Sequence, residues 1–131
     1  MRPDHTPPRF ILLLVAALAS LPAAADDAFD ACLKTAGTAE RRCGEDWVGR
    51  AQAKLDASWL QLLDVADGTG FMKALTDEQH AWEAFRDLSC RFKLDEGFGG
   101  ADGPTGYQAC RAGVIADRAA AIGAYVKYID N

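Results

Sequence analysis

The segment Thr76–Cys90, TDEQHAWEAFRDLSC, has the pattern of a helix with one apolar face, and the predicted fold is built around it. Each residue of an α-helix advances by roughly 100°, so side chains three or four positions apart share a face. In and just after this segment, six mostly apolar side chains would fall on about one third of the helix circumference. They are Ala81, Trp82, Phe85, Leu88, Ser89 and Phe92. The pattern predicts an amphipathic helix that begins at Thr76 and ends near Leu94.

One edge of this face combines three kinds of side chain. Arg86 and Cys90 follow Trp82 by one and two turns, so an aromatic ring, a cation and a thiol lie in a row. Thr76 and Gln79 have the spacing of a capping box, which favours a helix start at Thr76. The edge therefore holds candidates both for packing and for recognition.

A second long helix is predicted from just after Cys43 to about Ala66. Its apolar residues occupy one half of the circumference, which is typical of a helix that packs on a core. They are Trp47, Val48, Ala51, Leu55, Trp59, Leu62, Val65 and Ala66. Gly68 is suited to the left-handed conformation that ends such a helix. A short helix is expected before Gly37, where the chain can turn back.

The last helix is predicted to open at Thr105, with an arginine inside its apolar face. That face consists of Tyr107, Val114, Ala121, Ile122, Tyr125 and Ile129. Arg118 lies in its middle, and because arginine keeps its charge it must find an acceptor or reach solvent. Arg86 and Arg118 therefore allow two interpretations. They pair with carboxylates or carbonyls and fix the helix register, or they form a recognition surface beside Trp82.

The first 25 residues have the features of a secretory signal peptide. Arg2 and Arg9 precede the apolar run FILLLVAALASL, and residues 22–25 supply small side chains for cleavage. The run is too short to be read as a membrane-spanning helix, although an uncleaved anchor is the alternative. We therefore expect residues 26–131 to form one periplasmic or secreted domain without membrane attachment.

Export changes how the four cysteines are interpreted. Cys32, Cys43, Cys90 and Cys110 imply two disulfides in an oxidising compartment. Of the three possible pairings, we expect Cys32–Cys43 and Cys90–Cys110, because glycine-containing turns interrupt both intervals. We predict no metal and no cofactor, since the chain lacks a C-x-x-C motif and His80 is its sole histidine after cleavage.

The composition favours binding over catalysis. The net charge of −5 becomes −6 once Arg2, Arg9 and Asp4 are removed, which disfavours nucleic acid and anionic membranes and favours a basic partner. His80 falls on the polar side of its helix with no nucleophile beside it, so we predict no catalytic residues and no enzymatic activity.

A glycine-rich segment is the other candidate for recognition. Residues 96–106, EGFGGADGPTG, are predicted to form a loop without regular structure. Phe98 and Asp102 would be placed to enter a partner's cleft, because loops on rigid supports often carry function. A plain connection between helices is the alternative.

From about Cys32 to Tyr125 the chain resembles the LprI-type family of small exported bacterial proteins. The resemblance rests on the four cysteines, on the segments KLDASWLQLL and GYQAC, on Arg118, and on the string Q-x-x-W-x-x-x-R-x-x-x-C. This string is formed by Gln79, Trp82, Arg86 and Cys90. Most members have no known function, and the family is named for a lysozyme-inhibiting member. Unlike lipid-anchored relatives, this chain has no cysteine at the signal junction.

These observations predict an all-α fold, a small bundle of three main helices and a short N-terminal helix, closed by two disulfides. The resemblance implies an exported, non-enzymatic protein that inhibits a basic lysozyme by occluding its cleft. The alternative is a structural or interaction module that binds another envelope protein or a cell-wall fragment.

Overall fold

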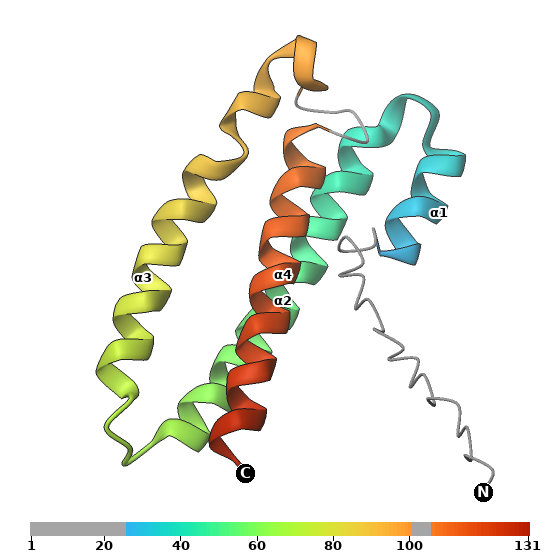
Figure 1. Cartoon of the computed structure of the whole chain (residues 1–131). Helices are drawn as coiled ribbons and strands as arrows, with labels where there is room; N and C mark the ends of the chain where they lie inside the picture. The colour runs from blue at the N-terminus through green and yellow to red at the C-terminus, as the bar shows by residue number, and fades with distance from the viewer. Residues whose placement is uncertain (1–25, 101–105) are drawn as a thin grey trace, which may run out of the picture.

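The computed structural model describes residues 26–100 and 106–131, and every regular element in these two ranges is helical (Figure 1). The α-helices are α1 (Asp27–Ala36), α2 (Glu40–Ala66), α3 (Met72–Ser89) and α4 (Tyr107–Ile129). The 3-10 helices are η1 (Gly37–Ala39), η2 (Arg91–Leu94) and η3 (Glu96–Phe98). The predicted all-α bundle is confirmed. The predicted signal peptide and Asp102 lie outside the described residues.

The core lies between α2 and α4, which pack side by side along much of their length (Figure 1). Its buried residues are Ala51, Leu55, Leu62, Ile115, Ala119 and Ile122. Burial of these side chains is the main force that holds the two helices together. Gly44 lets them approach closely, because a Cβ there would stand 2.7 Å from the Cβ of Gln108.

Helix α1 folds back on the start of α2 and closes a second apolar cluster. The Phe29 and Trp47 rings lie against each other at a tilt of 30°, with their centroids 4.6 Å apart, and both side chains are buried. A disulfide joins Cys32 to Cys43, as the sequence predicts. Asp26 caps α1 by accepting a hydrogen bond from the Phe29 amide. The first helix is therefore fixed to α2 by apolar packing and by a covalent bond.

Helix α3 stands apart from the α2–α4 pair over most of its length (Figure 1). It begins at Met72, not at Thr76, so the predicted capping box is wrong. The Thr76 hydroxyl instead donates to the Met72 carbonyl inside the first turn. The helix ends at Ser89, and residues 91–94 continue as the 3-10 helix η2. This placement leaves most of the predicted apolar face of α3 away from the core.

A second disulfide ties the end of α3 to the start of α4. Cys90 follows α3 directly, is fully buried, and bonds to Cys110 in the first turn of α4, as predicted. Helix α4 begins at Tyr107 behind the N-cap residue Gly106, and Thr105, where the sequence predicted its start, lies outside the described residues. None of the described helices has both the length and the hydropathy that a membrane-spanning helix needs.

Candidate functional site

The seam between α3 and α4 is built from residues that recur every three or four positions along α3. Gln79, Trp82, Arg86 and Cys90 share one side of that stretch of chain, because the spacing of three, four and four residues follows the helical period. Gln79 is the one buried residue within α3, and Trp82 packs against the apolar core. The Q-x-x-W-x-x-x-R-x-x-x-C motif therefore forms the side of α3 that meets α4.

Arg118 forms the polar centre of this seam. Its side chain is only 7% exposed, and its Nε donates to the Gln79 Oε1 at 3.0 Å. Its Nη1 donates to the Glu78 Oε1 at 2.6 Å. The Tyr125 hydroxyl donates to the same Glu78 oxygen at 3.0 Å. The buried guanidinium thus has the partners that a cation needs away from water.

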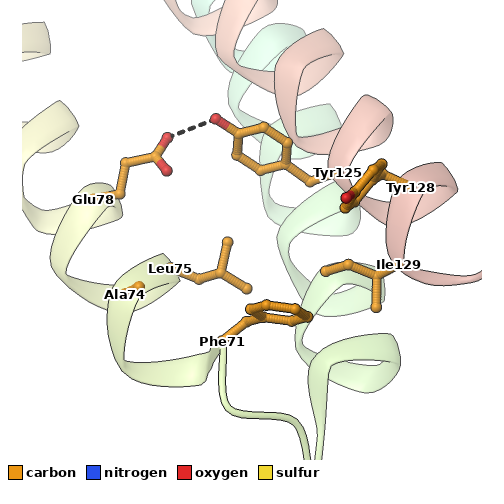
Figure 2. Close-up of a pocket in the computed structure, with 7 residues that line it drawn as sticks. All are labelled: Phe71, Ala74, Leu75, Glu78, Tyr125, Tyr128 and Ile129. Atoms are coloured by element: carbon orange, nitrogen blue, oxygen red, sulfur yellow. Dashed lines mark hydrogen bonds between the residues drawn. The ribbon is translucent and has the colours of Figure 1, made fainter.

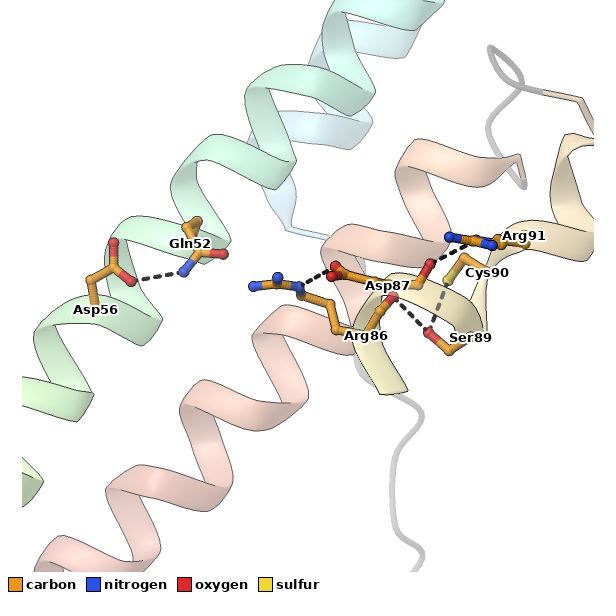
Figure 3. Close-up of polar contacts among 7 residues, drawn as sticks. All are labelled: Gln52, Asp56, Arg86, Asp87, Ser89, Cys90 and Arg91. Atoms are coloured by element: carbon orange, nitrogen blue, oxygen red, sulfur yellow. Dashed lines mark hydrogen bonds and ion pairs between the residues drawn. The ribbon is translucent and has the colours of Figure 1, made fainter. Parts of the chain in front are cut away.

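Trp82 completes this cluster from the side of α3. The guanidinium carbons of Arg86 and Arg118 lie 5.5 and 5.7 Å from the centre of its ring, within the range of cation–π attraction. Arg86 is partly exposed and its Nε donates to Asp87, its neighbour on the last turns of α3 (Figure 3). The structure therefore brings Trp82, Arg86 and Arg118 together, with Arg118 inside and Arg86 at the rim.

The ion pair changes the proton affinity of two side chains. The hydrogen bond from Arg118 lowers the pKa of Glu78 below its usual 4.5, against the opposing effect of partial burial, and the hydrogen bond from Tyr125 lowers it further. The same carboxylate raises the pKa of Tyr125 above its usual value, because it accepts the hydroxyl proton in a hydrogen bond. Glu78 is therefore ionised at neutral pH.

We expect the free energy of unfolding to fall as the pH is lowered below about 4.5, and Glu78→Gln to reduce this fall. A lowered pKa in the folded state means that the unfolded chain binds this proton more tightly, so stability is lost as the pH passes downward through the folded pKa. Urea unfolding at pH 7 and pH 3 measures the change. Asp26, whose pKa is lowered by Arg50, acts in the same direction and leaves a residual slope. Equal slopes for both proteins would contradict the prediction.

Two hollows lie along the α3–α4 seam. The two helices run in opposite directions, so the start of α3 faces the end of α4 (Figure 1). The first hollow, which we call the end groove, has a volume of about 260 Å³ and lies where α3 begins and α4 ends. Its main lining residues are Phe71, Leu75, Glu78, Tyr125, Tyr128 and Ile129 (Figure 2). The second is lined by Trp82, Phe85, Val114, Asp117, Arg118 and Ala121. The Glu78–Arg118 pair thus contributes one residue to each hollow.

Large apolar side chains are exposed where α3 ends. We call this set the apolar edge, and it consists of Phe85, Leu88, Phe92 and Phe98. Each of the four is between 54% and 59% exposed, and neighbouring Leu94 is 49% exposed. The rings of Phe92 and Phe98 meet edge to face, with their centroids 5.6 Å apart. Soluble proteins rarely expose so much apolar surface in one region unless another molecule covers it.

The described start of the glycine-rich segment, residues 96–100, contains regular structure that the sequence does not predict. Residues 96–98 form the 3-10 helix η3, which Asp95 caps by accepting a hydrogen bond from the Gly97 amide at 2.8 Å. Phe98 therefore packs on Phe92 instead of extending from an irregular loop. Asp102 lies outside the described residues. Of the predicted site residues, Phe98 belongs to the apolar edge and the other three described ones to the seam.

Two members of the site were not identified from the sequence. Glu78 is not among the predicted site residues, and Tyr125 is predicted only as part of the apolar face of its helix, yet both bond at the centre of the seam. The signal was present, since Glu78 precedes Trp82 by one helical turn and so shares its side of α3. In the described ranges, no three His, Cys, Asp or Glu side chains are grouped so that they could hold a metal ion.

Comparison with known proteins identifies a family and no individual relative. A family model described as lysozyme inhibitor LprI matches residues 32–122, which is more than half of the chain. Neither a curated protein nor a solved structure gives a significant match. The matched region includes all four cysteines, the apolar edge, and the seam residues Glu78, Gln79, Trp82, Arg86 and Arg118, but not Tyr125.

Proposed function

The chain belongs to the LprI family, and from this membership we propose that it is an exported, non-enzymatic binding protein of the cell envelope that inhibits lysozyme by occluding its cleft. The apolar edge is the structural observation that carries the proposal. It offers several large side chains next to the Cys90–Cys110 disulfide, which ties the end of α3 to α4. Such exposed aromatic and aliphatic anchors on a rigid support are typical of protein-binding surfaces.

Charge supports a basic partner. The net charge of −5 over the full sequence favours encounter with a positively charged protein, and lysozymes are commonly basic. Attraction of this kind raises the association rate and weakens as salt is added. The mechanism that we propose needs no chemical step, because a rigid helical body that fills the cleft excludes the polysaccharide substrate.

A turbidity assay tests this proposal. Lysis of a cell-wall suspension by lysozyme is followed with and without the purified, oxidised protein comprising residues 26–131. We expect lysis to slow at micromolar concentrations of the protein for at least one of several lysozyme types. Unchanged lysis with every type would reject inhibition and leave the second candidate, a module that binds another envelope protein or a cell-wall fragment.

We expect Phe85→Ala and Leu88→Ala each to weaken inhibition by about tenfold, with stability nearly unchanged. Truncation of a central apolar anchor typically costs more than 1 kcal/mol of binding, whereas exposed substitutions alter folding by about 0.5 kcal/mol or less. Leu60→Ala is the matched control, because Leu60 is 66% exposed on α2. Inhibition constants and thermal unfolding are measured together. An equal loss of inhibition in the Leu60 variant would show that the apolar edge is not the binding surface.

Phe98 and Asp102, the two residues predicted to act from the glycine-rich loop, can be tested in the same assay. Phe98→Ala is expected to act like Phe85→Ala, because the Phe98 ring supports that of Phe92 within the apolar edge. Asp102 stays a predicted contact, and Asp102→Ala is expected to lower inhibition without lowering thermal stability. Inhibition unchanged in both variants would shift the proposed surface to the helix faces.

A further inference from the structure

We propose that the end groove receives a lysine or arginine side chain of a basic partner protein. The inference rests on the proposed function in that a lysozyme would supply this side chain. It concerns a surface separate from the apolar edge, since the groove lies at the opposite end of α3 (Figure 1).

The walls of the groove suit the hydrocarbon part of such a side chain. Leu75 and Ile129 are half-buried at its base, while Phe71 and Tyr128 stand at its rim, 54% and 81% exposed (Figure 2). Lysine and arginine bury their methylene stems along apolar surface of this kind. Aromatic rings at the rim also attract a cation that approaches their faces.

One ionised group faces this apolar surface. Glu78 uses its Oε1 atom for both Arg118 and Tyr125, and its second carboxylate oxygen points toward the groove (Figure 2). A purely apolar occupant would cover this oxygen without giving it a hydrogen bond, which is unfavourable. An ammonium or guanidinium group would donate to it instead. Arg118 already balances the carboxylate charge, so the groove contributes selectivity and a moderate share of the affinity.

The neighbouring charges leave this role to an external cation. Lys73, five residues before Glu78 on α3, is engaged with Asp77 in an exposed pair. Arg118 is buried in the seam beneath Glu78 and does not line the groove. The volume of about 260 Å³ is below the roughly 300–1,000 Å³ of pockets for drug-sized ligands, which suits a single side chain.

NMR titration of the oxidised protein tests the chemistry of the groove directly. The probe is N-acetyl-lysine methylamide, and its neutral counterpart carries an acetyl group on the side-chain nitrogen. We expect the cationic probe to shift the methyl signals of Leu75 and Ile129 and the ring signals of Tyr128 at millimolar concentration. The neutral probe should bind at least fivefold more weakly. Equal shifts from both probes, or none from the cation, would overturn the inference.

A groove-filling variant adds a matched comparison. Ala74 lines the groove on an exposed turn of α3, so Ala74→Leu fills it without removing any partner of the ion pair. Ala84→Leu places the same side chain on an exposed turn that lines neither hollow. We expect the first variant to abolish the probe shifts and to weaken lysozyme binding by about tenfold, and the second to do neither.

These measurements separate the inference from the proposed function. Undiminished lysozyme inhibition by Ala74→Leu would overturn the proposed role of the groove and leave the proposed inhibition of lysozyme intact. If the lysine probe shifts the NMR signals of the groove residues but the protein inhibits no lysozyme, the role of the groove is supported and the proposed inhibition is rejected.

Discussion

Replacing Arg118 by alanine is expected to lower the free energy of unfolding by about 3 kcal/mol. The substitution removes a 7% exposed side chain, two charge-assisted hydrogen bonds and the cation beside Trp82. It also leaves the buried Gln79 without the donor that its Oε1 now has. Breaking a buried pair typically costs 3–5 kcal/mol, and the lower end applies because the Glu78 side chain is 44% exposed and keeps water as an alternative partner. Urea unfolding monitored by circular dichroism measures the change.

Two further variants separate charge from packing. Arg118→Met keeps most of the volume, and well-packed apolar replacements of buried ions are often tolerated, so we expect it to cost about half as much. Glu78→Gln keeps both helices intact but leaves the cation without its carboxylate. A double-mutant cycle that combines Arg118→Met with Glu78→Gln gives the coupling between the two side chains. A loss below 1 kcal/mol in Arg118→Ala would show that the seam is held by other contacts.

The sequence predicts a helix and its buried face well where a single apolar stripe packs against a single neighbouring helix. Every residue of the predicted α2 stripe is buried or half-buried, and the predicted left-handed residue at its end is found at Gly68, with φ of 71°. Helix α4 was harder, because it has two neighbours. Val114 and Ala121 line a hollow against α3, while Ile115 and Ala119, outside the predicted face, form the core with α2. A single apolar face cannot describe a helix between two others.

The start of α3 shows the limit of local signals. Threonine followed by glutamine three residues later is typical of a capping box, but the same residues also fit within a helix. The chain makes its turn earlier, where the Thr69 hydroxyl donates to the Ala66 carbonyl and accepts from the Phe71 amide. Helix α3 can therefore begin at Met72.

The candidate site depends on pairing across a long sequence separation. The spacing of Gln79, Trp82 and Arg86 indicated a common face, and Arg118 was expected to need an acceptor. The identity of that acceptor depends on the register of α3 against α4, because Arg118 bonds to residues 39 and 40 positions earlier. The exposure of the apolar edge could not be predicted either, because apolar periodicity identifies a helix face and does not show what covers it.

Removing the Cys90–Cys110 disulfide by alanine substitution at both positions is expected to weaken inhibition by at least tenfold. The bridge closes 20 residues, so the chain-entropy model gives a stability loss of about 3 kcal/mol. Inhibition should weaken more than this loss of stability alone would cause. Helix α3 makes few contacts with the rest of the bundle, and the bridge holds the end that carries the apolar edge. A surface that must be ordered on binding loses affinity relative to one that is already rigid.

Removing Cys32–Cys43 in the same way provides the matched control for this prediction. That bridge closes 11 residues, so its expected stability loss is also about 3 kcal/mol, but it joins α1 to α2 and leaves α3 untouched. At a temperature where both variants remain folded, hydrogen exchange should increase at the end of α3 only when Cys90 and Cys110 are replaced. Inhibition should follow the same pattern. An equal loss of inhibition in both variants would mean that the second disulfide acts through global stability alone, and that the apolar edge does not depend on it.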